Sequence, residues 1–223
     1  MIQKNTLHIL NGQAMYDYYR ETHFLEGEMM TPFNEAMCYG NTSNDLFSDE
    51  FIELRAKVHH VTPVQYIEHT LKPLQPLLSK NFTHISLWFD ADMFCQINLL
   101  TLLAWLDRTN HNHPLDLHLV GDKFNLLESF TLEAKGYDAL FKQVVIDKTM
   151  PSDIYPAILK QGVALYLNYL NEDSDLMRYI QKHQNLTEKE LMLALLETYT
   201  HLGLGDTQYM EIIKDYRKKV KRE

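Results

Sequence analysis

Short runs of apolar and β-branched residues alternate with longer stretches of helical periodicity along the first half of the chain. An alternation of this kind is typical of a sheet covered by helices, and it does not fit a helical bundle or a β-sandwich. The runs that predict strands are Thr6–Leu10, Met29–Phe33, His84–Phe89 and Leu115–Val120, with a weaker fifth at Gln143–Ile146. Each of the first four ends at polar or turn-forming residues.

Capping residues mark the starts of three helices in this half of the chain. Ser48 precedes a stretch of helical periodicity whose first turn is acidic, which the helix dipole favours. The segment Thr62–Gln65 combines an N-cap, a proline at the first helical position and a capping-box glutamine, so a helix should begin there and be kinked or stopped near Pro73. Asp92 stands at the N-cap position of a helix predicted over residues 93–106.

From about Ser152 onward the pattern is helical only. The helices predicted there are Ser152–Leu170, Ser174–His183, Thr187–Leu202 and Thr207–Lys221. We therefore expect an α/β domain over residues 1–125 and a helical C-terminal region over residues 126–223 that packs on it. The predicted fold class is α/β, with a mostly parallel four- to five-stranded sheet flanked by helices and an all-helical C-terminal region.

Composition limits the class of protein. A chain of 223 residues, 45% apolar and 23% charged, can close a core as one domain with a smaller appendage. Thirty acidic against 21 basic residues give a net charge of −9, so no nucleic-acid partner is expected, and the basic residues 217–222 fit a solvated helix end. The longest nearly apolar run, Ile97–Leu106, is about half a membrane span. With two cysteines and no charged-then-apolar leader, we expect a cytoplasmic protein without a membrane partner.

Polar side chains follow the first three predicted strands. They are Asn11 and Gly12 after the first strand, Asn34 and Glu35 after the second, and Asp90 and Asp92 after the third, with Gln96 one helical turn beyond Asp92. Parallel strands bring their carboxyl ends to one edge, where open sheets bind ligands, so we expect these groups to converge on one crevice. Glu35 or Asp92 could act there as a catalytic acid or base, or as a magnesium ligand. Each residue also has a simpler role: an N-cap for Asp92, a turn for Asn11-Gly12, and a solvated loop charge for Glu35.

Several segments together resemble a known family. They are His8-Ile9-Leu10-Asn11-Gly12, Phe33-Asn34-Glu35-Ala36-Met37-Cys38, Leu54-Arg55-Ala56, the long run Leu87–Leu100, and Gly203-Leu204-Gly205-Asp206. The chain resembles, over its whole length, the domain-of-unknown-function 1835 family of bacterial proteins. That family commonly has an acid at the position of Gln13, and it has no established activity. The resemblance therefore adds weight to Asn11, Glu35, Arg55, Asp92 and Gln96 as site residues without assigning a reaction.

Arg55 and the histidines leave further alternatives. A guanidinium near Glu35 or Asp92 could hold these carboxylates structurally, or it could receive a carboxylate or phosphate of a ligand. The pairs His59-His60 and His111-Asn112-His113 are interpreted as surface histidines, because no acidic or cysteine partner has metal-ligand spacing. We therefore expect no zinc or iron, leave magnesium open and name no other cofactor.

Two classes of function follow, and the sequence does not decide whether the protein is an enzyme. The first is a protein that binds or acts on a small polar or anionic ligand, phosphorylated or nucleotide-like, at the carboxyl ends of the strands. The second is a regulatory or interaction module whose polar cluster is structural. A ligand at the strand ends would favour the first class, and a dry, completely paired Arg55 would favour the second.

Overall fold

The computed structural model describes residues 5–79 and 82–220, and its centre is one five-stranded sheet. The strands are β1 (Thr6–Leu10), β2 (Met29–Pro32), β3 (His84–Asp90), β4 (Leu115–Val120) and β5 (Leu126–Leu132). Their order across the sheet is β2-β1-β3-β4-β5. The first four strands are parallel, and β5 pairs antiparallel with β4 at one edge. The prediction of a mostly parallel sheet in an α/β protein is confirmed.

The weak fifth strand predicted at Gln143–Ile146 is wrong. Those residues belong to a π-helical turn, η3 (Lys142–Ile146), in which Val144 and Val145 are buried. A short apolar run suits a buried helix as well as a buried strand, so its pattern could not separate the two. The observed fifth strand, β5, exposes Leu126 and Leu127 at the edge of the sheet and lies beyond the domain boundary predicted at residue 125.

The helices begin where the capping residues predict. They are α1 (Gln13–Glu21), α2 (Asp49–Val58), α3 (Pro63–Tyr66), η1 (Ile67–Leu71), α4 (Gln75–Ser79), α5 (Met93–Arg108), η2 (Asp122–Phe124), α6 (Tyr137–Phe141), η3, α7 (Ala157–Tyr169), α8 (Asp175–Lys182), α9 (Glu188–Thr198), η4 (Thr200–Leu202) and α10 (Asp206–Val220). Ser48 caps α2, Thr62 forms a capping box with Gln65 at α3, and Asp92 caps α5. The helix from Thr62 ends before Pro73, as predicted.

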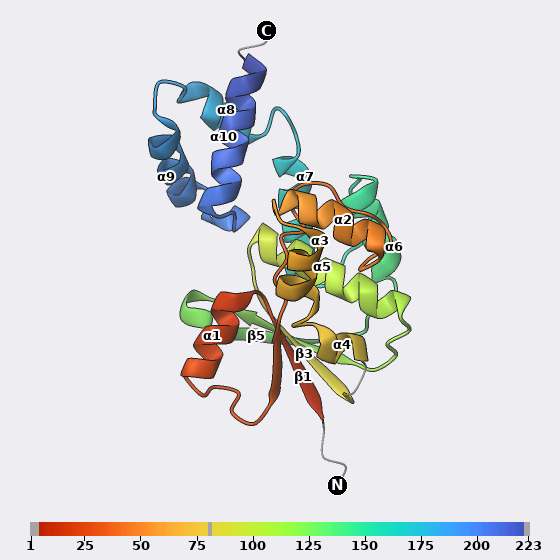
Figure 1. Cartoon of the computed structure of the whole chain (residues 1–223). Helices are drawn as coiled ribbons and strands as arrows, with labels where there is room; N and C mark the ends of the chain where they lie inside the picture. The colour runs from red at the N-terminus through yellow and green to blue at the C-terminus, as the bar shows by residue number, and fades with distance from the viewer. Residues whose placement is uncertain (1–4, 80–81, 221–223) are drawn as a thin grey trace.

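The region predicted as all-helical, residues 126–223, begins with β5 and is helical from Tyr137 onward, and two of its predicted helices have other bounds. The helix predicted from Ser152 starts only at Ala157, with Pro156 at its N-cap position. The helix predicted over Thr187–Leu202 stops at Thr198, because the chain turns through η4 to Gly203. Lys221, the predicted end of the last helix, lies outside the described residues. Figure 1 shows α8, α9 and α10 as a group beyond the carboxyl end of the sheet.

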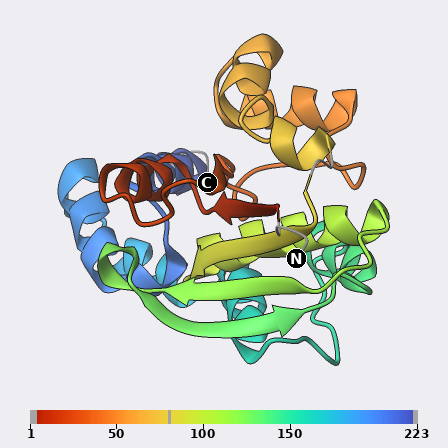
Figure 2. The same ribbon diagram turned by 90° about the horizontal axis from the view of Figure 1, so that it is seen from below.

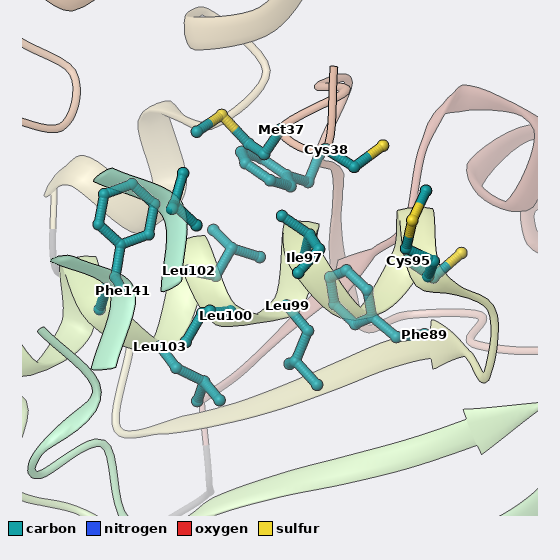
Figure 3. Close-up of a cluster of buried hydrophobic side chains, with 14 of the residues drawn as sticks. Met37, Cys38, Phe89, Cys95, Ile97, Leu99, Leu100, Leu102, Leu103 and Phe141 are labelled. Carbon is teal, nitrogen blue, oxygen red and sulfur yellow. The ribbon is translucent and has the colours of Figure 1, made fainter. Parts of the chain in front are cut away.

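The core is built around α5. Nearly every side chain of this helix is buried, because one side faces the sheet and the other faces α6, α7 and the loop after β2. Figure 3 shows Leu99 and Leu103 on the side toward the strands, and Ile97 on the side toward Met37 and Cys38. The opposite face of the sheet is covered by α1 through a smaller aromatic cluster.

The main core continues into the C-terminal region. Leu191 and Leu195 of α9 and Tyr209 and Ile213 of α10 belong to the same buried cluster as the sheet residues. The view from below shows the strands side by side, with the segment α2 to α4, orange to yellow, set to one side of them (Figure 2). The helices of the two halves of the chain therefore enclose the carboxyl edge of the sheet, which is where the candidate residues lie.

Candidate functional site

The predicted strand-end residues meet at one edge of the sheet. Asn11 directly follows β1, Glu35 follows β2, and Asp92 follows β3, and these three strands are parallel neighbours. Asn98 of α5 links the first two, because its Nδ2 donates to the Asn11 side-chain oxygen at 3.1 Å and to the Glu35 backbone oxygen at 2.7 Å. The predicted common edge for Asn11, Glu35 and Asp92 is confirmed.

A buried ion pair between Arg55 and Glu35 lies at this edge. Both side chains are completely buried, and Glu35 Oε1 accepts from Arg55 Nη2 at 2.7 Å and from Nε at 3.2 Å. The remaining guanidinium hydrogens go to the backbone oxygens of Ala36, Tyr39 and Asn41. Every donor of Arg55 therefore has an acceptor in the protein, and none is left for a ligand or for Asp92.

Two further side chains contact the Glu35 carboxylate. His59 Nε2 lies 2.6 Å from Oε1, and the Tyr66 hydroxyl donates to Oε2 through a short hydrogen bond. Burial alone would raise the pKa of Glu35, but Arg55 and His59 outweigh it and lower that pKa to about 2. The hydrogen-bond donors around this carboxylate stabilise its ionised form.

His59 is a candidate that the sequence interpretation missed. It was placed among the surface histidines, yet it contacts the buried Glu35 and its side chain is only 30% exposed. A usable signal was present: His59 lies four residues after Arg55, and residues at that spacing share one face of a helix. The neighbouring His60 does fit the surface interpretation, because its side chain is 72% exposed.

Asp92 has the simpler of its two predicted roles, as the N-cap of α5. Its Oδ1 accepts from the Cys95 backbone nitrogen at 2.7 Å, and its Oδ2 accepts from the Cys95 thiol at 3.3 Å. The same thiol lies 2.7 Å from Asn11 Nδ2. Burial raises the pKa of Asp92 to about 6, although its hydrogen bonds act in the opposite direction. A carboxyl group with that pKa changes its charge close to neutral pH.

The turn before α10 lies directly on the Asp92 carboxylate. Gly203 has a φ of +66°, and a Cβ added there would lie 2.3 Å from Asp92 Oδ1. Both its conformation and this contact require glycine. Gly203→Ala should therefore lower the free energy of unfolding by about 1 to 3 kcal/mol, measured by urea denaturation.

Gly205→Ala is the matched control for this prediction. A Cβ at Gly205 would meet only the end of the flexible Gln208 side chain, at 3.0 Å, and its φ lies outside the left-handed region. We expect a change in unfolding free energy of less than about 1 kcal/mol. Equal changes in unfolding free energy for the two substitutions would show that the turn at Gly203 does not pack tightly against Asp92.

The other predicted ligand-binding residues make local contacts. Gly12 has a φ of +91° at the start of α1, and Asn34 Nδ2 donates to the His69 backbone oxygen at 3.1 Å. Asp90 Oδ1 accepts from the Ala91 backbone nitrogen, and burial raises the pKa of this carboxyl. Gln96 Nε2 donates to the Asp90 backbone oxygen at 2.7 Å, while the buried Gln96 Oε1 has no partner among the described residues. These residues are brought to the same edge, but their contacts are those of turns and caps.

A cavity of about 830 Å³ lies next to this edge. Its walls come from the loop 38–42 after β2, from the end of η3 through Lys148, from the end of α7 and from the middle of α10. Arg55 supports one wall, because it binds the backbone oxygens of Tyr39 and Asn41 in that loop. None of the predicted site residues is among the described residues that line the cavity.

The cavity wall has an excess of positive charge. Its cations are Lys148, Lys214 and Lys218, and its anions are Glu211 and Asp215. Asp215 pairs with Lys218 at 3.0 Å, and Glu211 accepts from His60 and from the Tyr39 hydroxyl. Among the residues that the structure describes, no carboxylate lies within ion-pair distance of Lys148 or Lys214.

Tyr166 supplies a buried hydroxyl at the cavity wall. The residue is 2% exposed, its hydroxyl accepts a hydrogen bond from Lys148, and the Lys148 ammonium lies 4.9 Å from the centroid of its ring. Because the hydroxyl accepts from Lys148, its own hydrogen is available to another acceptor. Burial lowers the pKa of Lys148 below its ordinary value, which an anion in the cavity would oppose.

The chain matches no protein family model, no curated protein and no solved structure. The resemblance to the domain-of-unknown-function 1835 family therefore stays a prediction. Within the described ranges, no group of three or more histidine, cysteine, aspartate or glutamate side chains is arranged to hold a metal ion. Across residues 5–79 and 82–220, no helix has the length and apolar character needed to span a membrane.

Proposed function

We propose that this protein binds a small anionic molecule, bearing a phosphate or a carboxylate, in the cavity between the loop 38–42 and helices α7 and α10. The observation that carries the proposal is the pair of ammonium groups, Lys148 and Lys214, that have no carboxylate partner among the described residues. The Tyr166 hydroxyl adds a hydrogen-bond donor beside Lys148. Ammonium and hydroxyl donors at one wall are suited to the oxygens of an anion.

Size and lining also support a small molecule as the ligand. A cavity of about 830 Å³ falls in the range of roughly 300 to 1,000 Å³ that is common for small-molecule sites. Val58, Val145, Ile146 and Leu170 supply apolar surface around the charged groups. The cavity therefore offers an anion both charged groups for its oxygens and apolar surface for the rest of the molecule.

This proposal gives the Glu35–Arg55 pair a supporting role. Every donor of Arg55 is paired within the protein. By the criterion given in the sequence analysis, this favours a structural role for the polar cluster and not a ligand at the guanidinium. Through the backbone oxygens of Tyr39 and Asn41, the same pair fixes the loop that forms one side of the cavity. A rigid wall lowers the entropic cost of binding a ligand against it.

Titration calorimetry at low ionic strength tests the proposal, with pyrophosphate as the phosphate probe and citrate as the carboxylate probe. Lys148→Gln and Lys214→Gln should each raise the dissociation constant about tenfold or more, which corresponds to about 1.4 kcal/mol. Binding should weaken as salt is added, because screening reduces the attraction between exposed charges.

Lys160→Gln is the matched control for this titration. Lys160 is an exposed lysine of α7 that does not belong to the cavity lining. Its substitution removes the same charge from the same part of the protein and should leave both dissociation constants unchanged. Absence of binding by both probes, or equal affinities in all three variants, would contradict the proposal.

A further inference from the structure

β5 forms one edge of the sheet, and the outer side of this strand is open. It pairs with β4, and Figure 2 shows it as the outermost strand. Among the described residues, the backbone of residues 126–132 forms no backbone hydrogen bond beyond the ladder with β4. Alternate residues of an edge strand direct their N–H and C=O groups away from the sheet. This edge therefore presents a row of unpaired donors and acceptors.

β2, at the opposite edge, has protections that β5 lacks. It is only four residues long and ends in Pro32, and the Thr31 hydroxyl donates to the Pro73 backbone oxygen, so the segment before α4 lies against it. β5 is seven residues long and contains neither proline nor lysine. Short length, proline, lysine and cover by another segment are the features that prevent an edge from pairing with a further strand. Of the two edges, β5 is therefore the one that can accept another strand.

Two adjacent leucines are exposed at the start of this strand. Leu126 is 49% exposed and Leu127 is 68% exposed. Leu127 is the additional residue of a bulge, whereas residues 128–132 pair with β4 in regular register. A strand laid along this edge would remove part of the apolar surface from water as well as pair the backbone groups.

We propose that β5 pairs antiparallel with β5 of a second copy of this chain, which joins the two five-stranded sheets into one. Two identical strands that pair in this way are related by a two-fold axis, the commonest symmetry of protein dimers. The axis passes through Ser129, the middle residue of the strand, because that register pairs all seven residues.

The side chains of β5 are compatible with its own copy in this register. Glu128 is the only charged residue of the strand, and it lies opposite the partner's Phe130 and not opposite a second glutamate. Like charges directly opposite each other would destabilise the pair. The exposed Leu127 lies opposite the partner's Thr131. The strand is therefore complementary to itself in backbone and in charge.

The proposed interface is small and separate from the proposed anion site. One pair of seven-residue strands falls at the low end of interface sizes, below about 1,200 Å² of total buried surface, so the dimer should be reversible. None of the residues of β5 is among the described residues that line the large cavity. Dimerisation and anion binding can therefore succeed or fail independently.

Sedimentation equilibrium of the whole chain, from about 1 μM to about 1 mM, tests the proposal. The wild type should pass from monomer to dimer over this range, and Leu127→Lys should raise the dissociation constant of the dimer about tenfold or more. Val64→Lys is the matched control, because Val64 is 69% exposed but lies on α3, and it should dimerise as the wild type does. A dimer that Leu127→Lys leaves unchanged overturns the proposal. A chain that stays monomeric at the highest concentration also overturns it, and the edge would then suit an extended segment of another protein.

Disulfide formation between single-cysteine variants tests the register. In Ser129→Cys the two introduced Cβ atoms would lie about 4.5 to 5.5 Å apart across the axis, close to the separation that a disulfide needs. Thr131→Cys is the control, because its two copies would be four residues apart along the strands, roughly 13 Å. Cys38 and Cys95 are buried in the wild type and should contribute little. Under mild oxidation Ser129→Cys should form covalent dimers about tenfold faster or more, whereas equal rates for the two variants overturn the proposed pairing.

Discussion

Arg55→Met is expected to lower the free energy of unfolding by about 3 to 5 kcal/mol, the largest effect of any single substitution considered for this protein. The variant removes the cation that compensates the buried Glu35 carboxylate, whose side chain is completely inaccessible. It also leaves the backbone oxygens of Ala36, Tyr39 and Asn41 without their donors. Urea denaturation at pH 7, followed by circular dichroism, measures the loss.

Arg178→Met provides the comparison for this measurement. Arg178 also pairs with a carboxylate, Asp175, but the two side chains are 64% and 75% exposed. Solvent screens such a pair, so its loss should cost less than about 1 kcal/mol. If Arg55→Met were no more destabilising than Arg178→Met, the buried Arg55–Glu35 pair would not contribute to stability as expected.

The effect of Asp92→Asn on stability is expected to depend on pH. The unfolding free energy of the variant minus that of the wild type should be more positive at pH 7.5 than at pH 4. The folded-state pKa of Asp92 is about 6, against an ordinary value of 3.8, because burial disfavours the charged form. The folded protein therefore holds this proton more tightly than the unfolded chain does. The contribution of Asp92 to stability is greatest below pH 3.8 and is lost as the pH rises through 6.

The size of this effect follows from the shift in the pKa of Asp92. One unit of pKa corresponds to about 1.4 kcal/mol, so the stability difference between variant and wild type should change by about 2 to 3 kcal/mol over that interval. Asparagine caps a helix about as well as aspartate, so α5 should keep its start. Chemical denaturation of both proteins at pH 4 and pH 7.5 gives the difference. A difference that does not change with pH would contradict the raised pKa.

The elements that the sequence predicted well are those set by local chemistry. The starts of α2, α3 and α5 follow from capping side chains within four residues of each helix start. The common edge of Asn11, Glu35 and Asp92 follows from parallel pairing, which needs only the strands to be recognised. The error at Gln143–Ile146 arose because four residues are too few to distinguish the two periodicities.

The contacts of the site were harder to predict because they join distant parts of the chain. Arg55 could pair with Glu35 or with Asp92 on sequence grounds, and only the packing of α2 against the loop after β2 decides for Glu35. The cavity combines the loop 38–42 with Lys148, Tyr166 and Lys214, which no spacing pattern connects. His59 was misjudged because a histidine near the end of a helix looks solvated unless its buried partner is known.

Because α10 forms part of the cavity wall, the proposed anion site is completed late in synthesis. Chains leave the ribosome from the N-terminus, and the parts already released begin to fold first. The sheet, Arg55 and Tyr166 are all translated before Lys214, whereas α10 still has to add Tyr209 and Ile213 to the core. A nascent chain that has emerged only as far as α9 would carry Lys148 but not Lys214, so the proposed anion site would still be incomplete.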